Sequence, residues 1–451
     1  MGAPKTNWDE KTVMDTMSTP GGTWWEENMI AGPDEFEAGW FEEAQAYHKT
    51  GVLGCWNALT RVKVEGPDAE KTLMSICCNT FKNFTPGRVK HALFCNEDGK
   101  MIINGLLIHD AENEYIFTGG PLATWVLYKA LQAKDAGADL DAHLIDECSW
   151  SVSGPNSVFA SEEACGESLR DIKFMHSRFV TIDGIRCRCI RQSMTAELGY
   201  EFQAPAEYSD QLEAALKPVC DKWGIIEYGG RGGLTQEAEA GFLQIMDSML
   251  PAVCSESPED KDFRKFMEEY VPGTFEVQMK RGGSFEYDDP SALYRSPIEM
   301  GEGAMVKFDH EFIGRAALEA EAANPVRLCR SIIWNSEDVI DIFASLFQHD
   351  REPYDQLEIP HFSPSICKAD KVLDREGRII GISTRNMYSP WYRCYFSNVT
   401  IDKEYADLGT DVFVIYGEPG RPQKHVRATV APMRIKEDHR RDDVNALPSY
   451  L

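Results

Sequence analysis

The same short succession of strand, turn and helix occurs twice in this chain, and this repeat constrains the fold more than any other feature. Residues 60–65 (TRVKVE) alternate polar and apolar side chains, Gly66-Pro67 breaks the pattern, and the apolar spacing that follows is typical of a helix. Residues 148–153 (CSWSVS) and Gly154-Pro155-Asn156 repeat it before a second helical pattern. The repeat predicts two related subdomains of mixed α and β structure.

Strands dominate the rest of the expected architecture. Residues 91–119 read as three short strands with turn residues between them, which predicts an antiparallel sheet. From about Arg327 the pattern changes to short strands separated by turns, without a helix of comparable strength between them. We therefore expect a body over residues 1–326 and a smaller C-terminal β-barrel over residues 327–451.

Composition narrows the class of protein. A chain of 451 residues with 43% hydrophobic content is too long for one compact core. Its 73 acidic and 46 basic residues give a net charge of −27, which disfavours nucleic acid and anionic membrane surfaces as partners. No apolar run approaches the roughly eighteen residues of a membrane span and no N-terminal signal is visible, so we expect cytoplasmic residence. The cysteines and histidines show no paired metal-ligand spacing, and we expect no bound metal.

Several motifs along the chain identify a family resemblance. Residues 306–318 read VKFDHEFIGRAAL, and the chain also contains GPDAEKTL, NEDGKMIINGLLI, SGPNS, LGYEF, EAEAGF, GRIIGIST and GTDVFVIYGE. Together they resemble the aminomethyltransferase superfamily and, within it, the tetrahydrofolate-dependent O-demethylases of vanillate, syringate and 3-O-methylgallate. The resemblance implies an α+β fold: a ring-like folate-binding body of mixed α/β subdomains plus a C-terminal β-barrel. It also implies a pterin in a central channel, where a one-carbon group is exchanged.

The family pattern assigns roles to individual residues. Glu201, in LGYEF, matches the acidic residue that holds the pterin ring, and a carboxylate suits paired N–H donors. Arg231 and Glu239 stand at matching positions, where each is either a ligand contact or half of a structural ion pair. Aromatic side chains in the expected pocket segments suit a flat ligand or pack in the core; they are Trp24, Trp25, Trp40, Phe41, Trp56, Trp125, Tyr388, Trp391 and Tyr392.

The chain also departs from the family pattern. Asn104 replaces the acid that faces the reacting folate nitrogen, and an amide does not exchange a proton at neutral pH. Gly232-Gly233 follows Arg231 where the demethylases have a tyrosine, although Tyr228 lies nearby in the sequence. Gly120 aligns with an arginine that binds the substrate carboxylate. Trp56 and Asn57 stand where the demethylases carry polar residues, so we expect a more apolar substrate pocket.

Three functions remain open from the sequence. The first is tetrahydrofolate-dependent O-demethylation of a lignin-derived methoxylated aromatic, with Tyr228 or Tyr200 as general acid for the leaving oxygen. The second is a folate-independent lyase that releases formaldehyde from a hydroxymethyl group on a lignin aromatic dimer of the phenylcoumaran type, which the replacements at Asn104 and Gly120 favour. The third is a non-catalytic folate-binding protein. A small aromatic molecule is the expected partner of either enzyme, and a homo-oligomer is compatible with each function.

Overall fold

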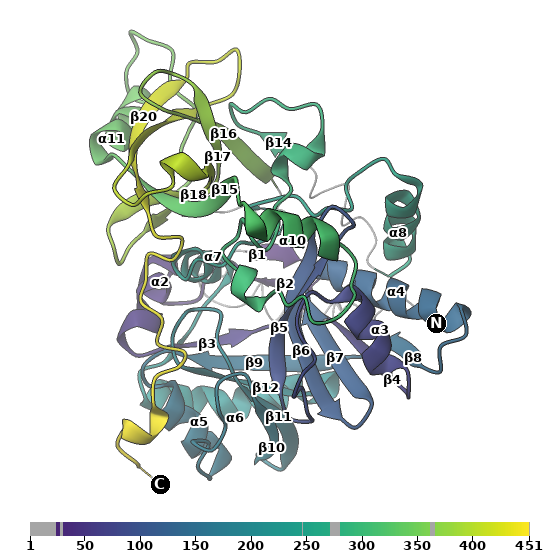
Figure 1. The fold of residues 1–451 in the computed structure, drawn as a ribbon. Coiled ribbons are helices and arrows are strands. Elements are labelled where there is room, and N and C mark those ends of the chain that lie inside the picture. The colour runs from purple at the N-terminus through teal and green to yellow at the C-terminus, as the bar shows by residue number, and fades with distance from the viewer. Residues whose placement is uncertain (1–23, 28–29, 246, 271–279, 361–365, 451) are drawn as a thin grey trace.

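The computed structural model describes residues 24–27, 30–245, 247–270, 280–360 and 366–450. Two β-sheets with their helices form the body, and a closed barrel lies beside them (Figure 1). A short hairpin precedes the body, with β1 at Trp24–Glu27 and β2 at Ile30–Pro33. None of the described helices is long and apolar enough to span a bilayer.

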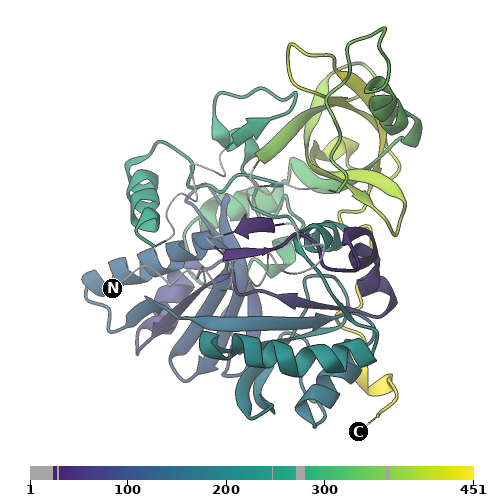
Figure 2. The same cartoon turned by 180° about the vertical axis from the view of Figure 1, so that it is seen from behind.

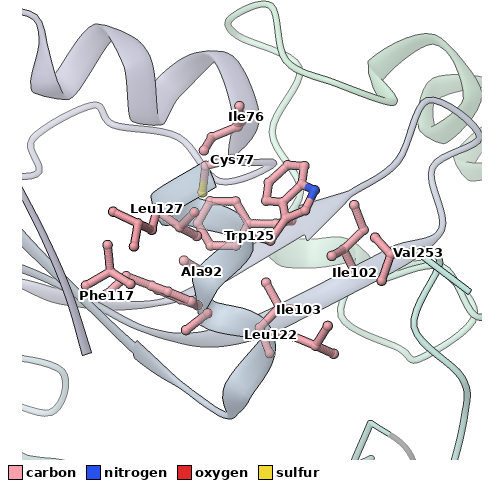
Figure 3. Packing of buried hydrophobic residues seen from close by; sticks show 14 of the residues in the cluster. Ile76, Cys77, Ala92, Ile102, Ile103, Phe117, Leu122, Trp125, Leu127 and Val253 are labelled. Carbon is pink, nitrogen blue, oxygen red and sulfur yellow. The ribbon is translucent and has the colours of Figure 1, made fainter. Parts of the chain in front are cut away.

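The first sheet of the body is antiparallel, as the sequence predicted, with strand order β5-β6-β7-β4-β8. Its strands are β4 (Thr60–Glu65), β5 (Val89–Cys95), β6 (Met101–Ala111), β7 (Glu114–Gly119) and β8 (Asp141–Leu144). Helices α3 (Ala69–Ile76) and α4 (Thr124–Asp135) pack against it. Trp125 of α4 is 4% exposed and lies in this core among Ile102, Leu122 and Val253 (Figure 3), which is the core-packing alternative for this residue.

The second sheet has strand order β10-β11-β12-β9-β3-β13. Its strands are β3 (Val52–Cys55), β9 (Glu147–Ser153), β10 (Ser177–Ile182), β11 (Ile185–Arg191), β12 (Gly199–Pro205) and β13 (Ile226–Glu227). Helices α5 (Ser157–Cys165) and α6 (Ser209–Lys222) pack on one face, and Figure 2 shows α6 in teal along the sheet. That face is the apolar core of the second subdomain.

The two predicted Gly-Pro turns connect β4 to α3 and β9 to α5. Gly66 and Gly154 adopt positive φ angles of 120° and 128°, which glycine tolerates and other residues rarely do. A Cβ at Gly154 would lie 2.3 Å from the Cα of Gly51, so the two backbone segments could not approach as they do with any larger residue. The repeat of strand, turn and helix is thus confirmed.

The C-terminal strands close into the expected barrel, in the order β16-β17-β18-β15-β20-β19 with β19 returning to β16. They are β15 (Arg327–Trp334), β16 (Ile366–Leu373), β17 (Ile379–Ser389), β18 (Cys394–Asp402), β19 (Asp411–Tyr416) and β20 (Lys424–Ala431). Strand β14 (Lys280–Gly282), from the expected body, pairs with β16. We expected no helix of comparable strength between the barrel strands, but the ten-residue α11 (Ser336–Ser345) follows β15, and the Asn335 side chain caps it by accepting from two backbone N–H groups.

The remaining described α-helices are α2 (Trp40–Lys49), α7 (Gly230–Glu239), α8 (Pro258–Glu268) and α10 (Arg315–Ala323). Helix α7 contacts the barrel strand β17, and α8 packs against α4 of the body. After β20 the chain leaves the barrel and returns to the second subdomain, as the yellow segment in Figure 1 shows. There the backbone N–H of His439 donates to the Ala196 carbonyl, and Val444 enters the apolar core. The last residues therefore belong to the packing of the body, although they follow the barrel in sequence.

Candidate functional site

A row of three directly paired residues, which we call the polar row, crosses three neighbouring strands of the second sheet. Gly54 on β3, Ser151 on β9 and Glu201 on β12 are register partners of one another. Side chains of directly paired residues share one face of a sheet, and their neighbours along each strand point to the other face. Val152 and Phe202 accordingly lie in the apolar core with α5 and α6. The row therefore occupies the face that these helices leave open.

Glu201 is the centre of this polar face. Its side chain is almost fully buried, and its carboxyl accepts hydrogen bonds from Ser149 Oγ (2.6 Å), Gln203 Nε2 (2.7 Å) and Gln192 Nε2. All three donors are neutral, which leaves acceptor capacity on a group that can accept about four hydrogen bonds. The guanidinium of Arg61, on the first sheet, is attracted by Glu201 across the space between the sheets.

The ring of Tyr228 lies between β3 and α7 beside this row. A Cβ at Gly54 would lie 2.2 Å from Tyr228 Cε1, and a Cβ at Gly233 would lie 2.9 Å from Cε2. The rings of Trp56 and Tyr228 meet edge to face with centroids 6.5 Å apart, and Trp56 Nε1 donates to Ser151 Oγ at 2.9 Å. Two glycines thus provide the space for this tyrosine, and Trp56, a predicted pocket residue, lies against it.

The environment keeps the Tyr228 hydroxyl protonated. Burial raises its pKa well above the ordinary value, and the negative charge of Glu237 adds to that effect. A hydrogen bond with Ser151 acts in the opposite direction and is weaker. At neutral pH Tyr228 therefore offers an O–H donor to the polar face.

Tyr200, the other tyrosine suggested by the sequence, is separated from this site. It pairs with Val152 and points to the apolar face, one residue out of phase with Glu201. Its hydroxyl lies 3.5 Å from the Leu169 carbonyl, and burial raises its pKa. The geometry gives this phenol a packing role and does not support its predicted role as a general acid.

Asn104 and Gly120 belong to the first subdomain. Asn104 on β6 pairs with Leu93 of β5; it is 8% exposed, and its Nδ2 finds no hydrogen-bond partner in the described part of the chain. Gly120 precedes the short 3₁₀ helix η1 (Pro121–Ala123), and a Cβ there would meet nothing within 4 Å. One position thus provides a buried donor and the other leaves room for a side chain.

Arg231 and Asn57 are engaged by the protein itself. Arg231 Nη2 lies 3.4 Å from Asp34 Oδ2, which fits the ion-pair alternative for this residue. Asn57 donates to Ser209 Oγ at 2.8 Å and accepts from the Ser149 backbone N–H at 2.8 Å. Its amide therefore links β9 to α6, and its predicted contact with substrate stays a prediction.

Glu239 links three elements of the fold. It is fully buried at the end of α7 and accepts hydrogen bonds from Tyr47 and from Ser389 Oγ at 2.6 Å, while His48 Nε2 lies 2.8 Å from it. These partners come from α2 and the barrel strand β17. The arrangement favours the structural alternative for Glu239 over cofactor binding.

Some of the aromatic candidates lie beside the polar row, and others pack against other parts of the protein. Trp24 and Trp25 belong to strand β1, but their side chains are outside the described part of the structure. Trp391 of the barrel stacks on His48 with ring centroids 4.4 Å apart. Among the predicted aromatic side chains that the structure describes, Trp56 lies beside the polar row.

One side-chain group in the described residues has the geometry to hold a cation: Glu65, Asp141 and His143, at the edge of the first sheet. Lys63 Nζ lies 2.7 Å from Glu65, and Lys134 Nζ lies 2.7 Å from Asp141. Lysines thus already balance both carboxylates.

The serines and glutamines around Glu201 were not predicted from the sequence. Ser149 and Ser151 alternate with buried Trp150 and Val152 along β9, and Gln203 follows Glu201 by two residues on β12. A polar residue at every second position of an otherwise apolar buried strand marks the face that is not in the core. That alternation was the available signal.

The sequence matches a known protein family and several named enzymes. Residues 13–253 match the family model described as the GCVT N-terminal domain. The chain is 32% identical to sesamin methylene transferase of Sinomonas sp. (strain No.22), over 89% of each protein. It is 28% identical to syringate O-demethylase of Sphingobium sp. (strain NBRC 103272 / SYK-6), over 90% of each.

The fold is similar to that of glycine cleavage system aminomethyltransferase T from Bartonella henselae. The TM-score is 0.68 with 14% sequence identity, covering 95% of this chain and 97% of the other. This likeness concerns the fold alone. It confirms the predicted aminomethyltransferase-like body with a C-terminal barrel.

Proposed function

Because the chain belongs to the GCVT family, we propose that it is a tetrahydrofolate-dependent enzyme that removes a one-carbon unit from a methoxylated aromatic compound. Two of its relatives are named for an O-demethylation and a methylene transfer, so the proposed unit is a methyl or a methylene group. The observation that carries the proposal is the row of Gly54, Ser151 and Glu201 with Tyr228 beside it.

The residues of the site fit a reduced pterin. Such a ring presents paired N–H donors together with acceptor atoms. Glu201 has acceptor capacity beyond its three neutral donors, and Asn104 Nδ2 is a buried donor without a partner among the described residues. Glu201 would hold the ring, and Asn104 would donate to it.

Tetrahydrofolate, when bound, supplies the nucleophilic nitrogen that accepts the carbon. The protein has to assist the departure of an aryl oxygen, which leaves poorly as an anion. Tyr228 keeps its proton and can donate it to that oxygen, with Ser151 and Trp56 orienting the phenol. Positioned general acids contribute about 10²- to 10⁴-fold to rate.

The charge pattern favours a substrate without a carboxylate. Gly120 carries no side chain where the demethylases place an arginine, and the space around it is open. Arg61 donates to two backbone carbonyls, and Arg231 lies against Asp34. A neutral methoxylated or methylenedioxy aromatic therefore suits this pocket better than a benzoate.

The test is turnover by the purified protein on neutral methoxyphenols, methylenedioxy aromatics and lignin-type dimers, with and without tetrahydrofolate. We expect a phenolic product and a folate carrying the carbon, both only when folate is present. Formaldehyde released without folate, together with a new conjugated double bond, would replace this proposal with the lyase. Folate binding without turnover of any compound would indicate a non-catalytic protein.

A further inference from the structure

His91 lies on the face of the first sheet that is turned toward the polar face of the second. His91 pairs with Leu106 across β5 and β6, and the next pair on this face is Leu93 with Asn104. Leu106 packs in one apolar cluster with Ile190 of β11, and Ile190 is the register partner of Glu201. Asn104 and His91 therefore lie on the side of the first sheet that is turned toward the Glu201 side of the second, and Leu93, beside Asn104, packs with Leu243 and Met300.

A carboxyl group accompanies His91 there. Glu302 precedes the short 3₁₀ helix η4 (Gly303–Met305), and its Oε1 lies 3.6 Å from His91 Nε2. That separation is longer than a hydrogen bond, and neither His91 Nε2 nor Glu302 Oε2 has a partner in the part of the chain that the structure describes. The two side chains are 20% and 21% exposed, but His91 Nε2 and Glu302 Oε2 are themselves buried, so both polar atoms lie in the interior without a partner among the described residues.

Several neighbours fix this pair in place. The His91 carbonyl accepts from Asn79 Nδ2 at 3.0 Å, and the Phe242 ring meets the imidazole edge to face at 6.0 Å. The charged group that acts on the pKa of His91 is Arg440 of the C-terminal segment, whose guanidinium binds Asp438 at 2.8 Å. The backbone and aromatic contacts leave the nitrogen and the carboxyl oxygen available for chemistry.

The pair is not an ion pair at neutral pH. Burial lowers the pKa of His91 to about 4, with Arg440 acting in the same direction, and burial raises the pKa of Glu302 to about 7. The imidazole is then neutral, and the carboxyl is poised between its two forms. Opposed shifts in neighbouring titratable groups are typical of acid–base sites.

We propose that His91 and Glu302 form the acid–base pair that takes the proton from the reacting nitrogen of folate, a task that Asn104 cannot perform. This inference rests on the proposed function. In the transfer a nitrogen–carbon bond forms, the carbon–oxygen bond breaks, one proton leaves the nitrogen and one arrives at the oxygen. The pair receives the first proton and releases it to solvent after the transfer, and Tyr228 provides the second. His91 thus belongs to the first sheet, and Tyr228 follows the last strand of the second.

The first test uses the protein without substrate. Histidine Cε1 resonances of the ¹³C-labelled full chain, with H91Q to assign His91, should show a titration step near pH 7 that is absent in E302Q. Adding tetrahydrofolate should move that step by at least about half a pH unit. A wild-type His91 resonance without any step near pH 7 would overturn the pairing.

The second test uses turnover. H91Q and E302Q should lower kcat by about 100-fold with little change in KM, and E302Q should abolish the rise of kcat with pH through about 7. H143Q, at the outer edge of the same sheet, is the matched control and should behave as wild type. An E302Q profile identical to that of wild type would reject the inference while leaving the proposed function intact. A wild-type chain without turnover, whose His91 step still responds to folate, would instead reject the proposed function.

Discussion

The phenol ring of Tyr228 lies so close over Gly54 that a Cβ at that glycine would be 2.6 Å from the hydroxyl oxygen. Gly54 comes from β3 and Tyr228 from the segment after β13, 174 residues apart by their numbers (228 minus 54). The glycine belongs to the same row as Glu201, so its missing side chain lets the phenol reach the polar face of the sheet. The position of the proposed acid is therefore set by the absence of a side chain on a neighbouring strand.

Replacing Gly54 by Ala should reduce activity more than stability. The atoms in conflict are at the far end of the Tyr228 side chain, which can rotate away, so the fold should tolerate the methyl group while the phenol loses its place. We expect kcat to fall by about 100-fold and the melting temperature to change by only a few degrees. A double-mutant cycle with Y228F separates the causes, since G54A should cost no further activity in the Y228F background. Equal losses in both backgrounds would show that Gly54 acts independently of Tyr228.

Replacing Tyr228 and Tyr200 in turn tests which face of the second sheet carries the general acid. Y228F removes the donor beside Glu201 and should lower kcat by about 10²- to 10⁴-fold. Y200F removes a hydroxyl that makes a single long contact in the apolar core, and it should leave kcat within about twofold of wild type. Steady-state kinetics on the same neutral aromatic ether measures both. A larger loss of kcat for Y200F than for Y228F would contradict the proposal, because it would place the general acid on the apolar face of the sheet.

The sequence contained part of this distinction. Tyr200 and Glu201 are neighbours on a strand, so they point to opposite faces, and alternation alone separates them once the strand is recognised. The family resemblance located Glu201 and the departures at Asn104 and Gly120. It also indicated the barrel, although the helix α11 after β15 was not expected.

Other features depend on contacts that no local pattern encodes. Glu239 accepts from Ser389, 150 residues away, and the ring of Tyr228 depends on glycines from two separate elements. His91 is an ordinary strand residue until Glu302 is placed beside it. Packing between distant segments decides whether a polar residue binds a ligand or another part of the chain, and one sequence does not reveal it.

Glu201→Gln should weaken folate binding. The glutamine keeps the size of the side chain but replaces an acceptor by an N–H₂ group that faces the donors Gln192, Gln203 or Ser149. Hydrogen bonds to charged groups contribute about 1.5–3 kcal/mol, so Kd should rise roughly 10- to 100-fold. Titration calorimetry with tetrahydrofolate measures it.

The control for that experiment is Glu162→Gln. Glu162 is equally buried and binds Arg170, but it lies on α5, behind the sheet. Both variants should lose stability, and only E201Q should lose affinity. Similar affinity losses in the two proteins would mean that general destabilisation explains the effect.

Asp370 should make the stability of the barrel depend on pH. Burial raises the pKa of this carboxyl from 3.8 to about 7, with the Ser284 backbone N–H donating to it at 2.9 Å. A folded-state pKa above the unfolded value means that the folded form binds more protons, so stability falls as pH rises from about 4 to about 7. D370N keeps an acceptor for Ser284 and removes the ionisation. Relative to wild type it should gain up to about 3 kcal/mol between pH 5 and pH 8, as measured by urea unfolding. D407N, at an exposed aspartate, should give no such gain, and parallel curves for D370N and wild type would contradict the assignment.

Gly120→Arg should extend the substrate range to carboxylated aromatics. The φ angle at this residue is −66°, which any residue adopts, and nothing lies within 4 Å of the new Cβ, so the arginine enters without strain. A guanidinium can bind a carboxylate through two parallel hydrogen bonds, each stronger than one between neutral groups. KM for a methoxybenzoate should therefore fall by about tenfold or more, while KM for neutral ethers changes little. G120M adds comparable bulk without charge and should not improve the benzoate. If G120M improves it as much as G120R does, contact area and not charge explains the gain, and the proposed preference for neutral substrates has to be attributed to another part of the pocket.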